Sequence, residues 1–348
     1  MFPTRPVVTP VSATLTQRRW QKFSHNRRGW YSLWILLILV VLCLLAELLA
    51  HERPIVVHYD GNWHFPQWID YSETTFGGDL PILADYRDPY LVELIEEQGW
   101  MVWPPIRYHY RSINYDSPHP HPAPPSQENW LGTDDQGRDV LARLIYGFRL
   151  SFLFAVLLTL ASAVIGIAAG AVQGYYGGKI DLLGQRFIEI WSGLPVLFVL
   201  IILSSIVQPS FWWLLGIMVL FSWTALVDVV RAEFLRGRNL EYVRAARALG
   251  VGDSAIILRH VLPNAMVATM TFLPFIFTGA VTTLTALDYL GFGLPPGSPS
   301  LGELVAQGKN NLHAPWLGLT AFFSLATLLT LLVFVGEGVR DAFDPRKS

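Results

Sequence analysis

Five long stretches of the chain carry no charged side chain. They span Trp30–Ala46, Leu150–Val172, Ile190–Val227, Val261–Leu287 and Ala314–Gly336. A helix needs about 20 apolar residues to cross about 30 Å of hydrocarbon. The third stretch has 38 residues and is interrupted by Gln208-Pro209-Ser210, so it reads as two helices. The pattern therefore predicts six membrane-spanning helices.

Composition favours the same interpretation. The chain is 52% hydrophobic and 15% charged, whereas soluble domains carry about 25% charge. A buried soluble core would need amphipathic faces and more frequent charges. The first stretch could instead be a secretory signal, but it exceeds the usual apolar core of about 7–15 residues and lacks a convincing cleavage site. We predict an uncleaved anchor. Pro195 in the third stretch and Pro274 in the fourth are expected to kink their helices.

Lysine and arginine predict the orientation. The segments before Trp30 and at 173–187, 231–264 and 337–348 together hold 17 of them, whereas the short loops 208–210 and 288–315 hold only Lys309. Positive residues stay on the cytoplasmic side of a membrane. Both termini and the loop 231–264 are therefore expected in the cytoplasm.

The chain divides accordingly into four regions. They are a cytoplasmic tail (1–29), a first transmembrane helix (30–50), an outer cap (51–147) and a core with five transmembrane helices (148–348). Residues 51–149 hold fifteen Asp and Glu and eleven of the 23 prolines. The many aromatic residues of this segment favour an ordered cap over a disordered linker. Within it, Asp88–Gly99 predicts a short helix that ends at Gly99.

Two features of the cap and first span raise the question of a metal or a disulfide. His119 and His121 are separated by a proline, a pattern more typical of a solvated loop than of a metal site. We predict no metal site. The single cysteine, Cys43, lies in an apolar run and reads as a packing residue.

The cytoplasmic loop contains EYVRAARALGVGDSAIILRHVLPNA (241–265). Asn239 can cap a first helix, and Gly250 can end it in the left-handed conformation. Asp253 or Ser254 can cap a second helix that stops before Pro263.

The first helix of this loop has two distinct faces. Tyr242, Ala246 and Leu249 are spaced to share one face, and Glu241, Arg244 and Arg247 follow another. Ala245 and Ala246 leave the backbone open to another surface. One alternative is an amphipathic linker that lies at the lipid headgroups, drawn there by its arginines.

This loop resembles the EAA motif of ABC-importer permeases. The matching positions are Ala245, Ala246, Gly250, Leu262 and Pro263. Arg244 stands where the general motif has glutamate, and His260 where it has isoleucine. The resemblance implies that an ATPase subunit binds the helix through Glu241, Tyr242, Arg244, Ala245, Ala246, Arg247, Leu249 and Gly250.

Two outer stretches resemble the dipeptide and oligopeptide branch of that family. NWLGTDDQGRDVLARLIYGFRLS (129–151) matches the signature before the second span, with Gly132, Thr133, Asp134, Gly137, Arg138 and Asp139 at its characteristic positions. Gly137 is expected to precede a helix, with the Asp139 carboxylate near the positive end of the helix dipole. LGFGLPPGSPSLGELV (290–305) resembles the outer loop before the last span, although Leu301 replaces the usual tryptophan.

The resemblance implies an all-α membrane protein with the six-helix fold of type I ABC-importer permeases and a large extracytoplasmic insertion after the first helix. That insertion is similar to the one in Yej-type permeases of bacterial peptide and microcin C importers. The expected partners are a second permease subunit, cytoplasmic ATPase domains and a periplasmic peptide-binding protein at the bacterial inner membrane. No nucleic-acid partner is expected.

No catalytic residue or cofactor is expected in the chain itself. The sequence contains no G-x-x-x-x-G-K-[ST] motif, so partner subunits are expected to bind the ATP. An ion-coupled peptide transporter is the alternative, but such proteins carry ionisable groups at mid-membrane. Here the acidic residues nearest to the predicted spans lie at the ends of those spans and not at mid-membrane. A membrane enzyme is a further alternative, yet His58, His64 and His109 show no nucleophile–base spacing.

Overall fold

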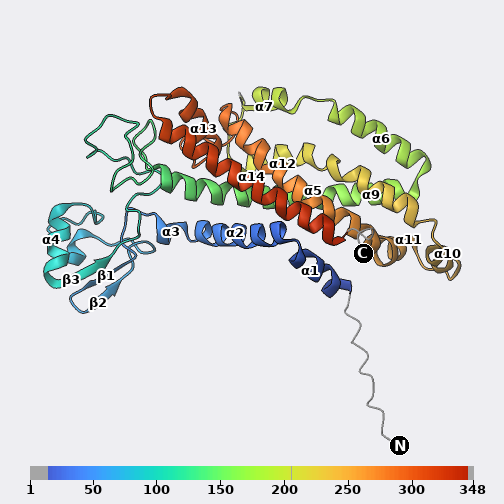
Figure 1. Cartoon of the computed structure of the whole chain (residues 1–348), viewed down its shortest axis with the longest axis horizontal. Coiled ribbons are helices and arrows are strands. Elements are labelled where there is room, and N and C mark those ends of the chain that lie inside the picture. Colours follow the sequence, from blue (N-terminus) through green and yellow to red (C-terminus); the bar gives the residue numbers. More distant parts are fainter. Residues whose placement is uncertain (1–14, 205, 344–348) are drawn as a thin grey trace, which may run out of the picture.

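The computed structural model describes residues 15–204 and 206–343 (Figure 1). In these ranges five helices are long and apolar enough to cross a membrane, and a bent pair of helices makes up to six. The predicted cytoplasmic tail and C-terminus lie partly outside the described residues, at 1–14 and 344–348. The helices form one bundle, with the cap at one end of it (Figure 1).

The helices of the bundle follow the predicted order. They are α1 (Leu15–His25), α2 (Arg27–Leu44), α3 (Ala46–Leu49), α5 (Val140–Tyr176), α6 (Gly178–Ser192), α7 (Val196–Ser204), α8 (Phe211–Ser222), α9 (Thr224–Gly237), α12 (Leu262–Tyr289), α13 (Leu301–Asn310) and α14 (Pro315–Phe343). The axes of α6 and α7 differ by 64°. Because their break contains Pro195, the predicted kink is confirmed, and the first arm of the third stretch is two helices rather than one. In the second arm, α8 and α9 together form one span, Phe211–Gly237.

The long helix α5 begins before the predicted boundary of the core. It starts at Val140 rather than at residue 148, because the Asp139 side chain caps it and accepts a hydrogen bond from the Ala142 N–H. The cap residue therefore sets the start of the helix, and the hydrophobic stretch begins only a few turns later. The prediction that a helix follows Gly137, with Asp139 at its positive end, is confirmed.

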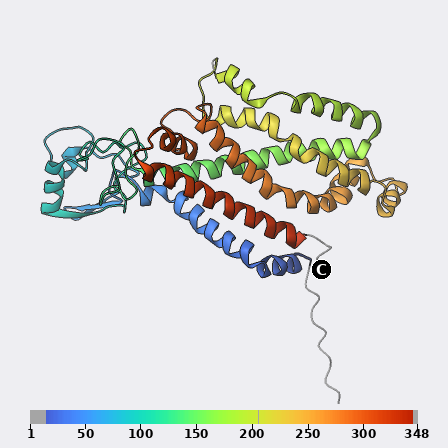
Figure 2. The ribbon, with the colours of Figure 1, turned by 45° about the horizontal axis from the view of Figure 1, so that its top comes forward.

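Small residues permit a close contact between α5 and α9. A Cβ atom added at Gly166 would lie 2.5 Å from the Trp223 carbonyl oxygen, and one added at Gly170 would lie 2.8 Å from that of Val227. These distances are shorter than van der Waals contact, so only glycine permits this approach. Elsewhere in the bundle, α14 packs against α2 and α12 (Figure 2).

The cap contains a small sheet, which the sequence pattern did not predict. Strands β1 (Val56–Tyr59), β2 (Asn62–His64) and β3 (Gly99–Val102) pair antiparallel in the order β2-β1-β3. Asp60 and Gly61 join β1 to β2 with φ of 46° and 74°. Two successive positive φ angles are what a tight hairpin requires, and Asp-Gly supplies them.

A helix covers one face of that sheet. Helix α4 (Pro89–Gln98) confirms the helix predicted at Asp88–Gly99, and the Asp88 side chain caps it. Its Leu91 and Ile95 are buried with Val57 of β1. A short 3-10 helix, η1 (Glu73–Phe76), completes this small core.

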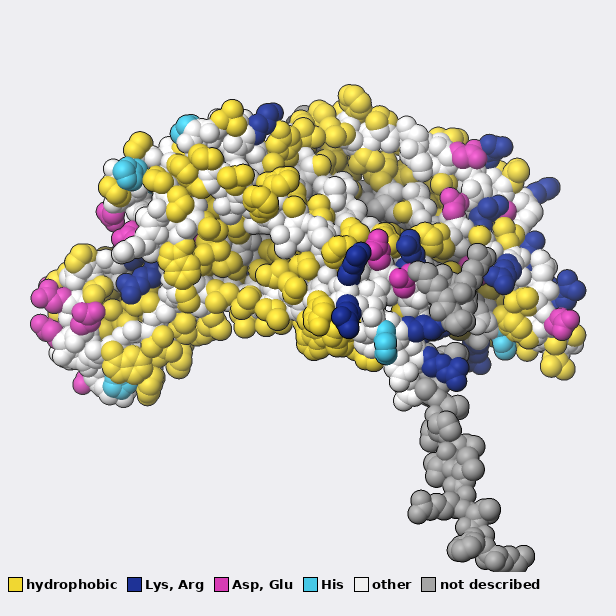
Figure 3. Space-filling view, in the orientation of Figure 1, with side chains coloured by type: hydrophobic (Ala, Val, Ile, Leu, Met, Phe, Trp, Pro, Cys, Tyr) yellow, Lys and Arg dark blue, Asp and Glu magenta, His cyan; other side chains and the backbone are white. Residues whose placement is uncertain are grey.

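Charge is distributed unevenly between the two ends of the molecule. Helix α1 and the end of α14 lie at the end opposite the cap (Figure 1). Lys and Arg side chains gather at that end, and hydrophobic side chains cover the middle of the visible face (Figure 3). The structure thus brings together the basic segments that the sequence assigns to one side of the membrane.

Candidate functional sites at the two ends of the bundle

The candidate coupling helix is α10 (Glu241–Ala248), which lies at the end opposite the cap (Figure 1). It is followed by a single helical turn, α11 (Asp253–Ala255), and by a π-helical turn, η2 (Ile256–Val261). The latter runs directly into α12, whose first turn contains Pro263. The predicted stop before Pro263 is therefore wrong, because a proline in the first turn of a helix needs no hydrogen-bond donor.

The predicted end of α10 is confirmed, but both predicted N-caps are wrong. Gly250 has a φ of +80°, and its N–H donates to the Arg247 carbonyl at 3.0 Å. Leu240, not Asn239, is the N-cap residue of α10. Gly252 precedes the second helix, since the Asp253 carboxylate accepts a hydrogen bond from the Tyr175 hydroxyl instead of capping a backbone N–H.

The sequence pattern did not predict which face of α10 is buried. Val243 and Ala246 are buried against residues of α9 and η2. Leu249 is 83% exposed and Tyr242 is 42% exposed, so these two do not share the buried face with Ala246. The reason is length: the helix ends at Ala248, and Leu249 turns outward as its C-cap residue.

The charged residues of α10 fall into two groups. Glu241 and Arg244 are exposed, as is the small Ala245. Arg247 instead donates to the Tyr175 hydroxyl at 3.1 Å and lies 5.6 Å from the centre of that ring. The hydrogen bond to Tyr175 raises the pKa of the Arg247 guanidinium. Arg247 therefore attaches α10 to the end of α5, while Arg244 and Leu249 face outward.

At the outer end, four charged side chains form a buried network. Arg138 Nε donates to Asp134 Oδ2 at 2.7 Å, and its Nη2 contacts Glu303 Oε1 at 3.0 Å. Arg143 Nη2 donates to Glu303 Oε2 at 2.7 Å, and its Nε lies 3.4 Å from Asp134 Oδ2. The side chains of Asp134 and Arg143 are fully buried. Two cations and two anions thus balance in a site where Glu303 alone is partly exposed.

Backbone geometry holds the outer signature residues in place. Gly132 and Gly137 have φ of +76° and +82°, values that favour glycine. Asp134 Oδ1 accepts the N–H groups of both Gln136 and Arg138 at 2.9 Å. Both carboxylate oxygens of Asp134 therefore have internal partners, and they stabilise this turn as a structural unit.

The neighbouring residues of that turn are also satisfied internally. Thr133 Oγ1 accepts the Ala123 N–H at 2.8 Å and lies 2.9 Å from His121 Nδ1. The other nitrogen of the His121 ring lies 3.0 Å from the Asn114 carbonyl oxygen. His121 is therefore tied into the fold rather than free in a solvated loop. In the residues that the structure describes, no group of three or more His, Cys, Asp or Glu is placed to hold a metal ion.

Burial and pairing shift the pKa values of this region. Burial raises the pKa of the Asp139 carboxyl, although hydrogen bonds from Asn129 and Ala142 favour its charged form. Burial opposes the charge of Arg138, but hydrogen bonds and attraction from Asp134 and Glu303 outweigh it and raise the Arg138 pKa. Pairing with Asp134 and Glu303 therefore stabilises the charged form of Arg138.

Sequence reasoning missed two members of this network, Arg143 and Glu303. Both lie inside the stretches that resemble the family, yet their spacing gives no sign that they meet. One signal was available: Arg143 is a charge within the first turns of a long apolar helix, where an unpaired cation is unfavourable. Its partner comes from α13, which is 160 residues away in the sequence.

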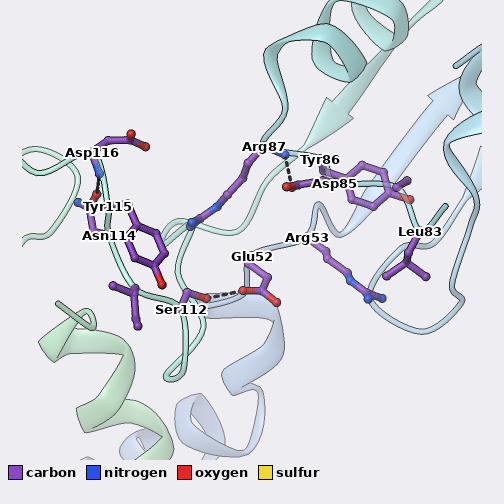
Figure 4. A pocket seen from close by; sticks show the side chains of 12 residues that line it. Glu52, Arg53, Leu83, Asp85, Tyr86, Arg87, Ser112, Asn114, Tyr115 and Asp116 are labelled. Atoms are coloured by element: carbon purple, nitrogen blue, oxygen red, sulfur yellow. Dashed lines mark hydrogen bonds between the residues drawn. The ribbon is translucent and has the colours of Figure 1, made fainter. Parts of the chain in front are cut away.

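The cap contains an open cavity of about 470 Å³ (Figure 4). Its Glu52 carboxylate accepts a hydrogen bond from Ser112, and the Asp85 carboxylate accepts the Arg87 N–H at 3.0 Å. Arg53, on its far side, pairs with Asp70 at 2.6 Å.

Comparison with known proteins places these features in a family. Residues 162–348 match the model of the binding-protein-dependent transport system inner membrane component. Residues 14–66 match the N-terminal transmembrane domain of oligopeptide transport permease C. The chain belongs to this family of ABC-transporter permeases.

Individual relatives agree with the family match. The inner membrane ABC transporter permease protein YejE of Escherichia coli (strain K12) is 64% identical over 96% of this chain and 98% of its own. The peptidoglycan transport system permease protein YejE of Agrobacterium fabrum is 56% identical over 99% and 96%. The oligopeptide transport system permease protein OppC of Lactococcus lactis is 33% identical over 65% and 78%.

The family confirms several predictions. The permease is a multi-pass protein of the inner membrane with the type I importer fold, and the resemblance to the Yej-type branch is confirmed. Membership also implies ATPase and binding-protein partners. The roles of individual coupling and signature residues stay predictions.

Proposed function

We propose that the permease carries peptides inward, as one of two different permease subunits driven by cytoplasmic ATPase domains. The cargo class is oligopeptides or peptide–nucleotide antibiotics such as microcin C, delivered by a periplasmic peptide-binding protein. The names of the relatives support this class, since they include peptidoglycan and oligopeptide transport systems. ATP is bound and hydrolysed by the partners alone.

One observation carries the proposal: an exposed helix with the family's coupling pattern is fixed rigidly to the spans. Val243 and Ala246 are buried against α9, and Arg247 is bonded to the end of α5. Just before α10, Arg238 donates to the Tyr175 carbonyl at 3.1 Å. A partner that moves α10 would therefore move these helices with it, as a ligand-driven switch requires.

The proposed orientation places α10, both termini and the basic end in the cytoplasm. The excess of Lys and Arg at that end supports it (Figure 3). The cap then faces the periplasm, where the binding protein delivers cargo.

Uptake into proteoliposomes tests the function. Vesicles contain the permease, its second subunit and the ATPases, with ATP inside, a labelled tripeptide and the binding protein outside, and no ion gradient. We expect uptake that depends on ATP and is unaffected by a protonophore. Uptake that needs a proton gradient and continues without ATP would instead establish ion-coupled transport.

A further inference from the structure

The turn Phe65–Ile69, which follows β2, presents three apolar side chains to the outside. Phe65, Trp68 and Ile69 are 41%, 63% and 51% exposed. The Trp68 and Ile69 N–H groups both donate to the Phe65 carbonyl, at 3.1 and 3.0 Å. This closes a compact turn whose apolar side chains point outward while Pro66 is buried beneath them.

The inward side of this turn is attached to the outer end of the first span. Gln67 Nε2 donates to the Glu47 carbonyl oxygen at 3.0 Å and to that of Arg53 at 3.3 Å. Arg53 Nη1 in turn donates to the Pro66 carbonyl at 3.1 Å. The turn is thus held beside α3, at a fixed height along the bundle.

That height corresponds to the membrane interface. Glu47 lies three residues beyond the end of α2, or about 4.5 Å at 1.5 Å per residue. The interfacial region on each side of the hydrocarbon is about 5–8 Å thick. A charge pair marks the same level, since Glu47 contacts Arg149 of α5 at 2.8 Å just before the uncharged part of that helix.

The turn also continues an apolar surface that already faces lipid. The last turns of α2 expose Val41, Leu44 and Leu45 by 47%, 48% and 47%. In a protein of the inner membrane such a face contacts acyl chains. Tryptophan and other aromatic side chains are favoured at the headgroup level directly beyond it.

We propose that the turn Phe65–Ile69 is an interfacial anchor. Phe65, Trp68 and Ile69 enter the headgroup region of the leaflet on the cap's side, next to the first span. This contact holds the cap against the membrane. The anchor does not depend on the cargo or on the ATPase partners.

Fluorescence quenching tests the anchor in the full-length chain. A fluorophore is attached at Ile69→Cys in a Cys43→Ala background, so that Phe65 and Trp68 remain. The chain is reconstituted in vesicles of phosphatidylethanolamine and phosphatidylglycerol that contain a lipid with a nitroxide on its headgroup. The matched control is Tyr90→Cys, an exposed position on α4, which is the helix at the end of the cap farthest from the bundle (Figure 1).

We expect the nitroxide lipid to quench the label at residue 69 severalfold more than the label at residue 90, and iodide in the water to do the reverse. Adding Phe65→Ser and Trp68→Ser should remove the difference, while both positions are exposed enough for the cap to fold. Equal iodide quenching at residues 69 and 90 would overturn the anchor. Protection of residue 69 from both quenchers would also overturn it, because protein rather than lipid would then cover the turn.

Discussion

The two ends of the permease carry family-like residues in opposite environments. At the outer end, Asp134, Arg138 and Arg143 are buried and use their charges on one another and on Glu303. At the opposite end, Arg244 and Leu249 of α10 lie exposed. Buried, internally satisfied charges specify a fold, whereas exposed residues on a rigid base are free to bind a partner. The same kind of sequence signature therefore indicates structure at one end and contact at the other.

The largest expected effect comes from breaking the buried network. Arg143→Met leaves Asp134 and Glu303 with one cation between them, so we expect a loss of about 3–5 kcal/mol in the free energy of unfolding. Denaturant titration of the purified permease measures it. Arg149→Met is the matched control on the same helix, because its pair with Glu47 is partly exposed and is worth less than about 1 kcal/mol. Equal losses in both variants would show that the network is not the stabilising element.

The next effect tests the left-handed end of α10. Gly250→Val forces a β-branched residue into a φ of +80°, at a cost of about 2 kcal/mol unless the turn rearranges. A Cβ at this position meets nothing within 4 Å, so the effect is on the backbone alone. We expect ATP-driven uptake to fall sharply while the permease still folds.

Gly252→Val is the control for that variant. This glycine also has no neighbour within 4 Å, but its φ is −67°, which valine tolerates. Uptake should stay near the wild-type rate. Normal uptake by Gly250→Val would mean that the geometry of this turn does not matter for coupling.

A smaller effect depends on pH and concerns the cap side alone. Burial lowers the pKa of His109 from 6.5 to about 4, helped by the nearby His51. The unfolded chain takes up a proton near pH 6.5, whereas the folded protein does so only near 4. The stability is therefore complete above pH 6.5 and is lost as the pH falls from 6.5 to about 4.

The loss should be about 1–2 kcal/mol, reduced from the full value because the ring is partly exposed. Thermal unfolding midpoints between pH 7.5 and 4 measure it, and His109→Gln should flatten the slope. His51 contributes in the same direction, since burial lowers its pKa as well. An unchanged slope in His109→Gln would assign the pH dependence to other groups.

The sequence predicted the spans well and the contacts of the coupling loop less well. Charge-free runs, Pro195 and Gly250 act locally, and the structure follows them. Asn239 and Asp253 failed as caps because their side chains bond elsewhere. Asn239 Nδ2 donates to the Leu235 carbonyl of α9, and Asp253 accepts a bond from Tyr175 of α5. The β1–β2 hairpin has a local signal in Asp60-Gly61, but the many prolines and turns of the cap obscured it. The Arg143–Glu303 pair joins distant segments, so local patterns could not reveal it.

The smallest effect on stability decides whether the exposed end is a contact surface. Arg244→Glu and Leu249→Asp change exposed side chains, so the free energy of unfolding should change by less than about 0.5 kcal/mol. Co-purification of the ATPase subunits should nevertheless be lost. Arg247→Glu should lower the free energy of unfolding and also abolish co-purification, because it breaks the bond to Tyr175 as well. Arg186→Glu on α6, which is also exposed, is the control and should retain the ATPase. If Arg244→Glu and Leu249→Asp also retain the ATPase, the exposed face of α10 lies against lipid headgroups. The two ends would then differ in their exposure but not in whether they bind a partner.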